Sequence, residues 1–154
     1  MKPRAYLLKA QKYANEHSGC TKVAVGSVIV KSSQIISFGA NSTDIPCKTA
    51  GCLRQQKYGD NNKTHRNPDD CRAIHSEIQA ISRAAAIGKK LEGATIYVTR
   101  YPCEACARAI AYSGIDEVVF GRKTNMTTMS LDILKAAGVK IVHESEWEYD
   151  DAIN

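Results

Sequence analysis

The feature that most constrains the fold of this chain is an alternation of strand and helix patterns that begins at residue 73. Ile74, Ile78, Ile81 and Ala85 recur at helical spacing, and Gly88 ends this pattern. Helices at 104–112 and 130–137 then alternate with strands at 94–100, 117–120 and 139–143. Because parallel strands must be joined by a crossover, usually a helix, this order predicts an α/β layered domain with a partly parallel sheet.

The segment before residue 73 has two parts of different character. Residues 4–17 carry apolar side chains at helical spacing, with His17 and Gly19 as stop signals. The β-branched run 23–30 and the segment 34–39 predict a hairpin. Residues 41–72 show no such periodicity, so we expect an irregular insertion there. A loop of that length in a compact domain is unusual unless something fixes it.

The composition indicates a single globular domain spanning 1–154. Of the residues, 44% are hydrophobic and 24% charged, which excludes disordered, collagen-like and membrane-spanning classes. The first residues lack the apolar core of a signal peptide, so we expect a cytoplasmic protein. In that reducing compartment the six cysteines are expected to be metal ligands or reactive groups rather than disulfides.

The charge is distributed unevenly along the chain. All 21 basic residues lie at or before Lys140, whereas an acidic tail at about 144–154 holds Glu144, Glu146, Glu148, Asp150 and Asp151. A basic body attracts the phosphates of a nucleotide or a nucleic acid, although a solvated surface has the same composition. Charge alone does not choose between them.

Two short fragments carry the chemistry, His75-Ser76-Glu77 and Pro102-Cys103-Glu104-Ala105-Cys106, each at a predicted helix start. Two cysteines three positions apart point the same way, and a histidine from another helix start can join them. Three N/S ligands with one open position are typical of catalytic zinc, although a C-x-x-C alone also fits a redox or structural-zinc site. Glu77 lies where a carboxylate can take a proton from an attacking water and deliver it to the substrate.

The sequence resembles the zinc-dependent cytidine deaminase superfamily, and within it the deoxycytidylate (dCMP) deaminases of bacteria and phages. The matching segments are Cys20–Lys22, Val25–Val30, Gly51–Arg54, Cys71–Glu77, Ile96–Thr99, Pro102–Ala107 and Ser113–Ile115. The resemblance implies a three-layer fold whose mixed five-stranded sheet is flanked by helices. It implies His75, Cys103 and Cys106 as Zn²⁺ ligands and Glu77 as the proton shuttle. It also implies a homo-oligomer, usually a hexamer.

The resemblance further suggests which residues bind the substrate. Lys22 stands where an arginine is usual beside the 5′-phosphate, and Asn41 matches the residue that binds the deoxyribose hydroxyl. Ala73 is expected to help fix the base, and Tyr101 either lines the base pocket or covers the core. Residues 39–42 read Gly-Ala-Asn-Ser where the family commonly has Gly-Tyr-Asn-Gly. This departure bears on the family's regulation by dCTP and dTTP, the former with Mg²⁺.

Other cysteines and histidines need an account of their own. Some relatives hold a second, structural zinc near the irregular segment, and here its candidate ligands are Cys20, Cys52, His65 and Cys71, with Cys47 as a substitute. The alternative is that these cysteines are small buried hydrophobes. His17 and His143 are expected at a helix end and a strand end. Arg72 and Trp147 fit either an interface or the chain's own surface.

The function that these observations favour is hydrolysis of dCMP to dUMP and ammonia, which supplies dUMP for thymidylate synthesis. Alternatives are a deaminase of dCTP, CMP or a base in tRNA or single-stranded nucleic acid. A non-catalytic zinc module that binds nucleic acid is a further alternative, which Glu77 argues against. We expect a nucleotide substrate, no membrane contact, no nucleic-acid partner, and the cytoplasm of a bacterial or phage-infected cell.

Overall fold

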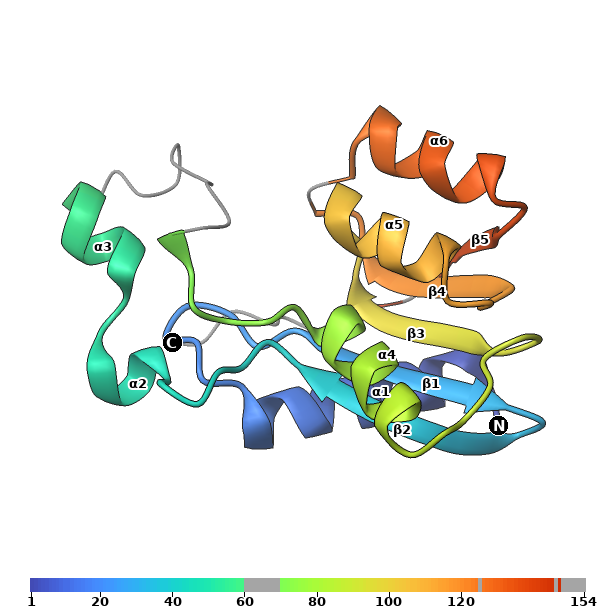
Figure 1. The fold of residues 1–154 in the computed structure, drawn as a ribbon, viewed down its shortest axis with the longest axis horizontal. Helices are drawn as coiled ribbons and strands as arrows, with labels where there is room; N and C mark the ends of the chain where they lie inside the picture. Colours follow the sequence, from blue (N-terminus) through green and yellow to red (C-terminus); the bar gives the residue numbers. More distant parts are fainter. Residues whose placement is uncertain (60–69, 125, 146, 148–154) are drawn as a thin grey trace.

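The computed structural model describes residues 1–59, 70–124, 126–145 and 147. Its centre is a five-stranded sheet in the order β2-β1-β3-β4-β5 (Figure 1). The strands are β1 (Gly26–Lys31), β2 (Gln34–Ala40), β3 (Thr95–Arg100), β4 (Glu117–Arg122) and β5 (Lys140–His143). β1 pairs antiparallel with β2 and β3, whereas β3, β4 and β5 are parallel. The predicted mixed five-stranded sheet is therefore confirmed.

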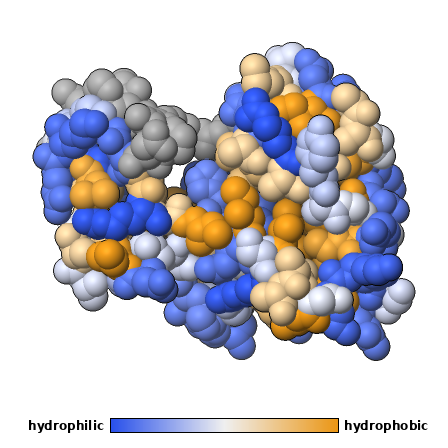
Figure 2. All heavy atoms as spheres, in the orientation of Figure 1, coloured by the Kyte–Doolittle hydropathy of each residue, from blue (hydrophilic) through white to orange (hydrophobic). Residues whose placement is uncertain are grey.

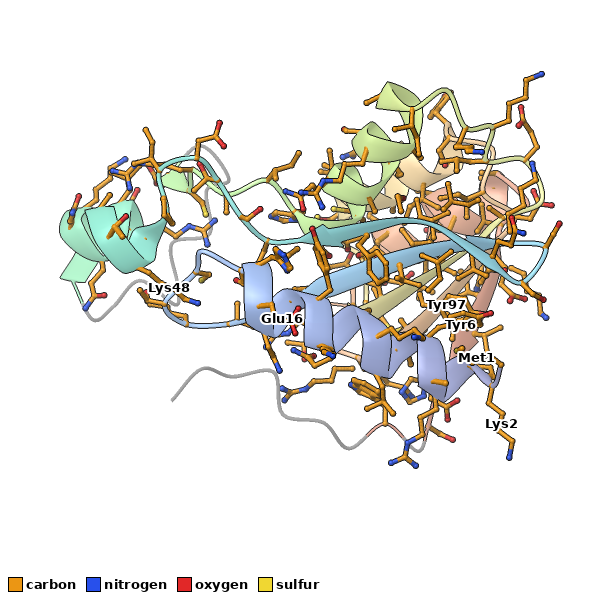
Figure 3. The ribbon with its side chains drawn as sticks, turned by 90° about the horizontal axis from the view of Figure 1, so that it is seen from below. Met1, Lys2, Tyr6, Glu16, Lys48 and Tyr97 are labelled. Carbon is orange, nitrogen blue, oxygen red and sulfur yellow. The ribbon has the colours of Figure 1, made fainter. Side chains whose placement is uncertain are left out.

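Helices cover both faces of this sheet, which gives the three layers. The strand residues alternate between two cores: Ile29, Ile96, Val98, Val118 and Phe120 face one side, and Val28, Val30, Tyr97 and Val119 face the other. On the first side lie α4 (Ser76–Ala86), α5 (Glu104–Ala111) and α6 (Thr128–Ala136). On the second lies α1 (Pro3–His17), whose Tyr6 packs on Tyr97 with ring centroids 4.7 Å apart (Figure 3). No helix among the described residues is long and apolar enough to cross a bilayer.

The segment 41–72 was expected to be irregular throughout. This expectation is wrong at two places. It contains the short helices α2 (Cys47–Ala50) and α3 (Leu53–Tyr58), which lie apart from the sheet in Figure 1. Gly51 and Gly59, both at positive φ, end the two helices. Helices of four and six residues are too short to show a periodic apolar face, so the sequence pattern did not indicate them.

One close approach between the sheet and α4 matters for the site. A Cβ atom on Gly39 would lie 1.9 Å from the carbonyl oxygen of Ser76, so only glycine lets the first turn of α4 rest on β2. Gln79 strengthens the contact, because its side-chain oxygen accepts from the backbone N–H of Ala40 at 2.9 Å. The start of α4 is thus fixed against the sheet edge.

Candidate metal centre and active site

Three potential metal ligands converge at the starts of α4 and α5. His75 and Cys103 immediately precede the two helices, and Cys106 lies in the first turn of α5. His75 Nδ1 lies 3.5 Å from Cys103 Sγ and 3.4 Å from Cys106 Sγ, and all three ligand atoms lie within 4.8 Å of one another. Tetrahedral zinc with ordinary N and S bond lengths would separate its ligands by about 3.6 Å. The donor set and its spacing therefore fit a zinc ion.

The electrostatics of the two cysteines also favour a cation. A hydrogen bond from the Cys106 thiol, together with the nearby imidazole of His75, lowers the pKa of Cys103 to about 4. Cys106 donates that bond and is buried, so its own pKa is raised. The Cys103 sulfur in turn raises the pKa of His75. The site thus presents a thiolate, which is the form of cysteine that binds metals.

Glu77 lies beside this group in the first turn of α4 and is only 4% exposed. Burial raises the pKa of its carboxyl group, against the opposing effect of nearby His75. Ser76 Oγ donates to Glu77 Oε2 at 3.0 Å. A carboxyl group with a raised pKa is suited to accept and return a proton near neutral pH.

The four candidate substrate residues, Lys22, Asn41, Ala73 and Tyr101, differ in their exposure and contacts. Lys22 is exposed on the loop between α1 and β1, and Ala73 is half-buried shortly before α4. Asn41 holds that loop: its Oδ1 accepts from Ser18 Oγ at 2.7 Å and from Val25 N at 2.9 Å, and its Nδ2 donates to Val23 O at 3.0 Å.

Tyr101 is buried in the core. Its ring is 3% exposed, belongs to the core beneath α5 and α6, and meets Phe120 edge-on with centroids 4.8 Å apart. This is the position expected of a residue that covers the core, and a role of Tyr101 in the base pocket stays a prediction.

A pocket of about 460 Å³ is lined by Ile74, the residue before His75, and by none of the three potential metal ligands. The remaining lining residues are His17, Ser42, Thr43, Asp44, Arg72, Gln79 and Arg83. Two guanidinium groups face one carboxylate here, so the pocket favours anions. Figure 2 shows the surface hollowed between the lobe of α2 and α3 and the body of the sheet. Sequence reasoning missed Gln79 and Arg83, whose convergence with Ser42 depends on the packing of α4 against β2.

Four more cysteines gather around α2. The backbone N–H of Lys48 donates to Gly19 O at 3.2 Å, which brings the neighbours Cys47 and Cys20 together. Arg72 donates to Gly51 O at 3.0 Å, which does the same for Cys71 and Cys52. Burial raises the pKa of Cys47, and the three other sulfurs raise it further. His65 lies outside the described residues.

Among the described residues, only the His75–Cys103–Cys106 group brings three or more potential ligand atoms within 4.8 Å of one another. No three of the four cysteines around α2 therefore form such a group.

The other histidines, Arg72 and Trp147 lie against the chain itself. His17 is the last residue of α1, and His143 ends β5, where it stacks on Phe120. Trp147 is 9% exposed and packs on the α1 side of the sheet with Tyr6 and Tyr97. Gly121 leaves space for it, since a Cβ atom there would lie 2.4 Å from the indole.

The sheet order, the three layers and the His–Cys–Cys group at two helix starts define a protein of the cytidine-deaminase-like class. A family model described as MafB19-like deaminase matches residues 1–144. The chain belongs to this deaminase family.

Known proteins similar to the chain carry deaminase names. The deoxycytidylate deaminase of Mycobacterium phage D29 is 34% identical over 125 residues, which cover 77% of this chain and 94% of that protein. The deoxycytidylate deaminase of Saccharomyces cerevisiae is 32% identical over 140 residues, and the match spans 89% of this chain but only 43% of that longer protein. The tRNA-specific adenosine deaminase of Bacillus subtilis is 33% identical over 119 residues, 75% of this chain and 59% of that protein.

A solved structure shares the fold over nearly the whole chain. It is the dCMP deaminase of cyanophage S-TIM5 in complex with dCMP and dUMP, with a TM-score of 0.71 and 25% identity. The match covers 93% of this chain and 98% of that one.

Proposed function

We propose that this chain is a zinc-dependent deaminase that hydrolyses dCMP to dUMP and ammonia and thereby supplies dUMP for thymidylate synthesis. The observation that carries the proposal is the buried Glu77 carboxyl group beside the His75, Cys103 and Cys106 ligand set. Relatives named deoxycytidylate deaminase support the choice of substrate. We also propose that residues 1–154 act as one domain in the cytoplasm of a bacterial or phage-infected cell.

The proposed division of roles follows from the chemistry of the side chains. His75 Nδ1 and the two thiolates would hold Zn²⁺ and leave one position open. Zinc in such a site acts as a Lewis acid that makes a water molecule nucleophilic near neutral pH. Glu77 accepts one proton of the attacking water and delivers it to N3 of cytosine. It then takes the remaining proton from the hydroxyl group on C4 and transfers it to the departing amine. The amino group leaves C4 as ammonia, and the water oxygen becomes the carbonyl oxygen of dUMP.

We assign the substrate contacts to the loop between α1 and β1 and to the segment before α4. The Lys22 ammonium group contacts the 5′-phosphate as a point charge. Asn41 uses one N–H of its amide on Val23 O, and its second N–H is the group we assign to the deoxyribose hydroxyl. The backbone at Ala73 and at the Cys103 turn fixes the base.

An ammonia-release assay over cytosine, deoxycytidine, CMP, dCMP, dCTP and single-stranded DNA tests the function. We expect the highest kcat/KM with dCMP, because one phosphate and one deoxyribose match the proposed contacts. Fastest turnover of dCTP or CMP would assign the chain to another cytosine nucleotide. Turnover of DNA or of an adenosine in tRNA would favour nucleic-acid deamination, and no turnover at all would favour the non-catalytic zinc module.

The same panel run on Lys22→Ala examines the phosphate contact. We expect the preference for dCMP over deoxycytidine to fall about tenfold, which corresponds to the loss of one charge-assisted hydrogen bond. Lys12→Ala, which removes an exposed lysine from α1, is the control and should keep the preference of the wild type. An unchanged preference in Lys22→Ala would show that another group binds the phosphate.

We further propose a second, structural zinc in the cluster around α2, with Cys20, Cys52 and Cys71 as ligands. We propose Cys47 as the fourth ligand in place of His65. The hydrogen bonds at Gly19 and Gly51 bring Cys47 near Cys20 and Cys52 near Cys71, and the three other sulfurs raise the pKa of Cys47. Arg72 lies beside Cys47 and offsets part of the negative charge of four thiolates. A metal there would fix a segment that otherwise has only short helices.

Metal analysis tests the second site directly. We expect two zinc ions per wild-type chain and one in Cys52→Ser, with a lower melting temperature in the variant. His65→Ala should keep two ions, whereas Cys47→Ser should keep one. A single zinc ion per wild-type chain would refute the second site. Loss of an ion in His65→Ala but not in Cys47→Ser would make His65, and not Cys47, the fourth ligand.

The hexamer and the regulation by dCTP with Mg²⁺ and by dTTP stay predictions of the resemblance. The pocket between α1 and α4 is the place that we assign to such an effector, because Arg72 and Arg83 suit its phosphates. Ser42 lines this pocket and accepts a hydrogen bond from Gln79 Nε2 at 2.7 Å. Ser42 stands where the family commonly has glycine. The lining of the pocket therefore differs from the family's at a position where this sequence departs from the family pattern.

A further inference from the structure

Three buried side chains form a hydrogen-bonded chain from the sheet to Glu77. Ser27 Oγ on β1 lies 2.7 Å from Ser76 Oγ, and Ser76 Oγ lies 3.0 Å from Glu77 Oε2. Both serines are fully buried. Two hydroxyl groups placed in an apolar core at the cost of their hydration point to a specific use for their hydrogen bonds.

The number of protons on each group decides which group donates and which accepts in this series of hydrogen bonds. A hydroxyl group has one proton to donate, and an ionised carboxylate only accepts. Ser76 therefore donates to Glu77, and Ser27 must donate to Ser76. Within the described part of the molecule, Ser27 Oγ has Ser76 Oγ as its one hydrogen-bond partner, so this order has no competing acceptor. Oε2 is thereby held as an acceptor, and Oε1 is the oxygen that we assign to proton transfer.

The contact restrains a side chain that helix geometry leaves free. Successive side chains on a helix point in different directions, and a glutamate has three rotatable bonds. Ser76 itself is fixed, because its backbone rests on Gly39 and its hydroxyl group is tied to β1. A rigid sheet thus sets the position of Ser76, and Ser76 sets the position of the carboxylate.

We infer that Ser76, supported by Ser27, is a positioning residue that fixes the Glu77 carboxylate with Oε1 toward the reacting groups. This inference rests on the proposed deamination. Removal of the Ser76 hydroxyl takes away one of the restraints on the carboxylate, whose other partners are its own backbone N–H and Cys106, so it lowers the fraction of time in the productive orientation. The effect falls on turnover and not on the binding of the substrate.

The test compares Ser76→Ala with Ser37→Ala. Ser37 is also buried, and its hydroxyl group donates from β2 to Ala80 O of the same helix at 2.8 Å, without contact to Glu77. We expect about a tenfold lower kcat in Ser76→Ala, the loss of one hydrogen bond to a charged group, with KM for dCMP within twofold. Ser37→Ala should keep the kcat of the wild type. Zinc content should be unchanged in both variants.

Two further measurements separate positioning from general stability. Ser27→Ala should lower kcat in the wild-type background but not in the Ser76→Ala background, because Ser27 acts only through Ser76. In crystal structures, the Glu77 side chain should adopt one rotamer in the wild type and more than one in Ser76→Ala. The rotamer comparison needs no turnover.

The outcomes distinguish this inference from the proposed function. If the wild type deaminates dCMP and Ser76→Ala matches Ser37→Ala in kcat, the positioning role is wrong. A single, unchanged Glu77 rotamer in Ser76→Ala also overturns it, whatever the activity. If the wild type turns over no substrate while the rotamer of Glu77 changes as expected, the deamination is wrong and the restraint on Glu77 stands.

Discussion

Glu77→Gln is expected to lower kcat for dCMP by about 10³-fold or more, within or above the range for loss of a general acid–base group. The amide keeps the shape of the side chain and its contact with Ser76 but cannot carry the proton from water to the ring and the leaving amine. The zinc content should equal that of the wild type, because Glu77 is not among the proposed ligands. Steady-state kinetics with ammonia detection and metal analysis on one preparation give both results.

Glu104→Gln is the matched control for this variant. Glu104 is also an acidic residue in the first turn of a helix next to a proposed ligand, and its Oε1 accepts from Thr127 Oγ1 at 2.9 Å. Its neutral amide should keep kcat within about threefold of the wild type, as expected for a mostly structural contact. More than a tenth of wild-type activity in Glu77→Gln would exclude Glu77 as the proton shuttle.

The second large effect is expected for the metal centre. Cys103→Ser should lose one of two zinc ions and reduce turnover to the background of the assay, because an alcohol is a far weaker zinc ligand than a thiolate. A strong chelator should inactivate the wild type in the same way, and added zinc should restore turnover. Metal analysis before and after dialysis, with activity at each step, measures both effects.

Cys52→Ser provides the comparison. It should also lose one zinc ion, but the folded variant should keep its turnover. Two variants with equal metal content and opposite activity would assign catalysis to the centre at α4 and α5. If Cys103→Ser retained turnover, the ligand set proposed here would be wrong.

The sequence predicted the part of the fold after residue 73, where the periodic apolar patterns are long. The helix that carries Glu77 and the strand–helix pair around Cys103 were expected, since each motif sits at the start of a strongly periodic segment. The predicted strand 23–30 begins too early, because 23–25 is as apolar as the strand itself, whereas β1 begins at Gly26. There, side chains replace strand pairing: Gln11 Nε2 donates to Ala24 O at 3.0 Å, and Asn41 binds the backbone of Val23 and Val25.

Contacts between distant segments could not be predicted from local patterns. The Ser27–Ser76 hydrogen bond joins residues 49 positions apart, and nothing in the segments around the two serines indicates that they meet. Tyr101 follows the strand that leads to the metal ligands, so its sequence position alone fits a pocket as well as a core. The packing of Tyr101 in the core cluster with residues of α5 and α6 depends on contacts between distant segments, which no local pattern shows.

The packing of Trp147 gives the protein an internal optical probe. It is the single tryptophan of the chain, and it lies on the sheet face covered by α1, opposite the face covered by α4 and α5. Its fluorescence emission therefore reports the hydration of the α1 face without direct quenching by groups at the metal centre. A red shift on zinc removal would show that loss of the metal loosens the sheet through its full thickness, and constant emission would confine the change to the face that binds the metal.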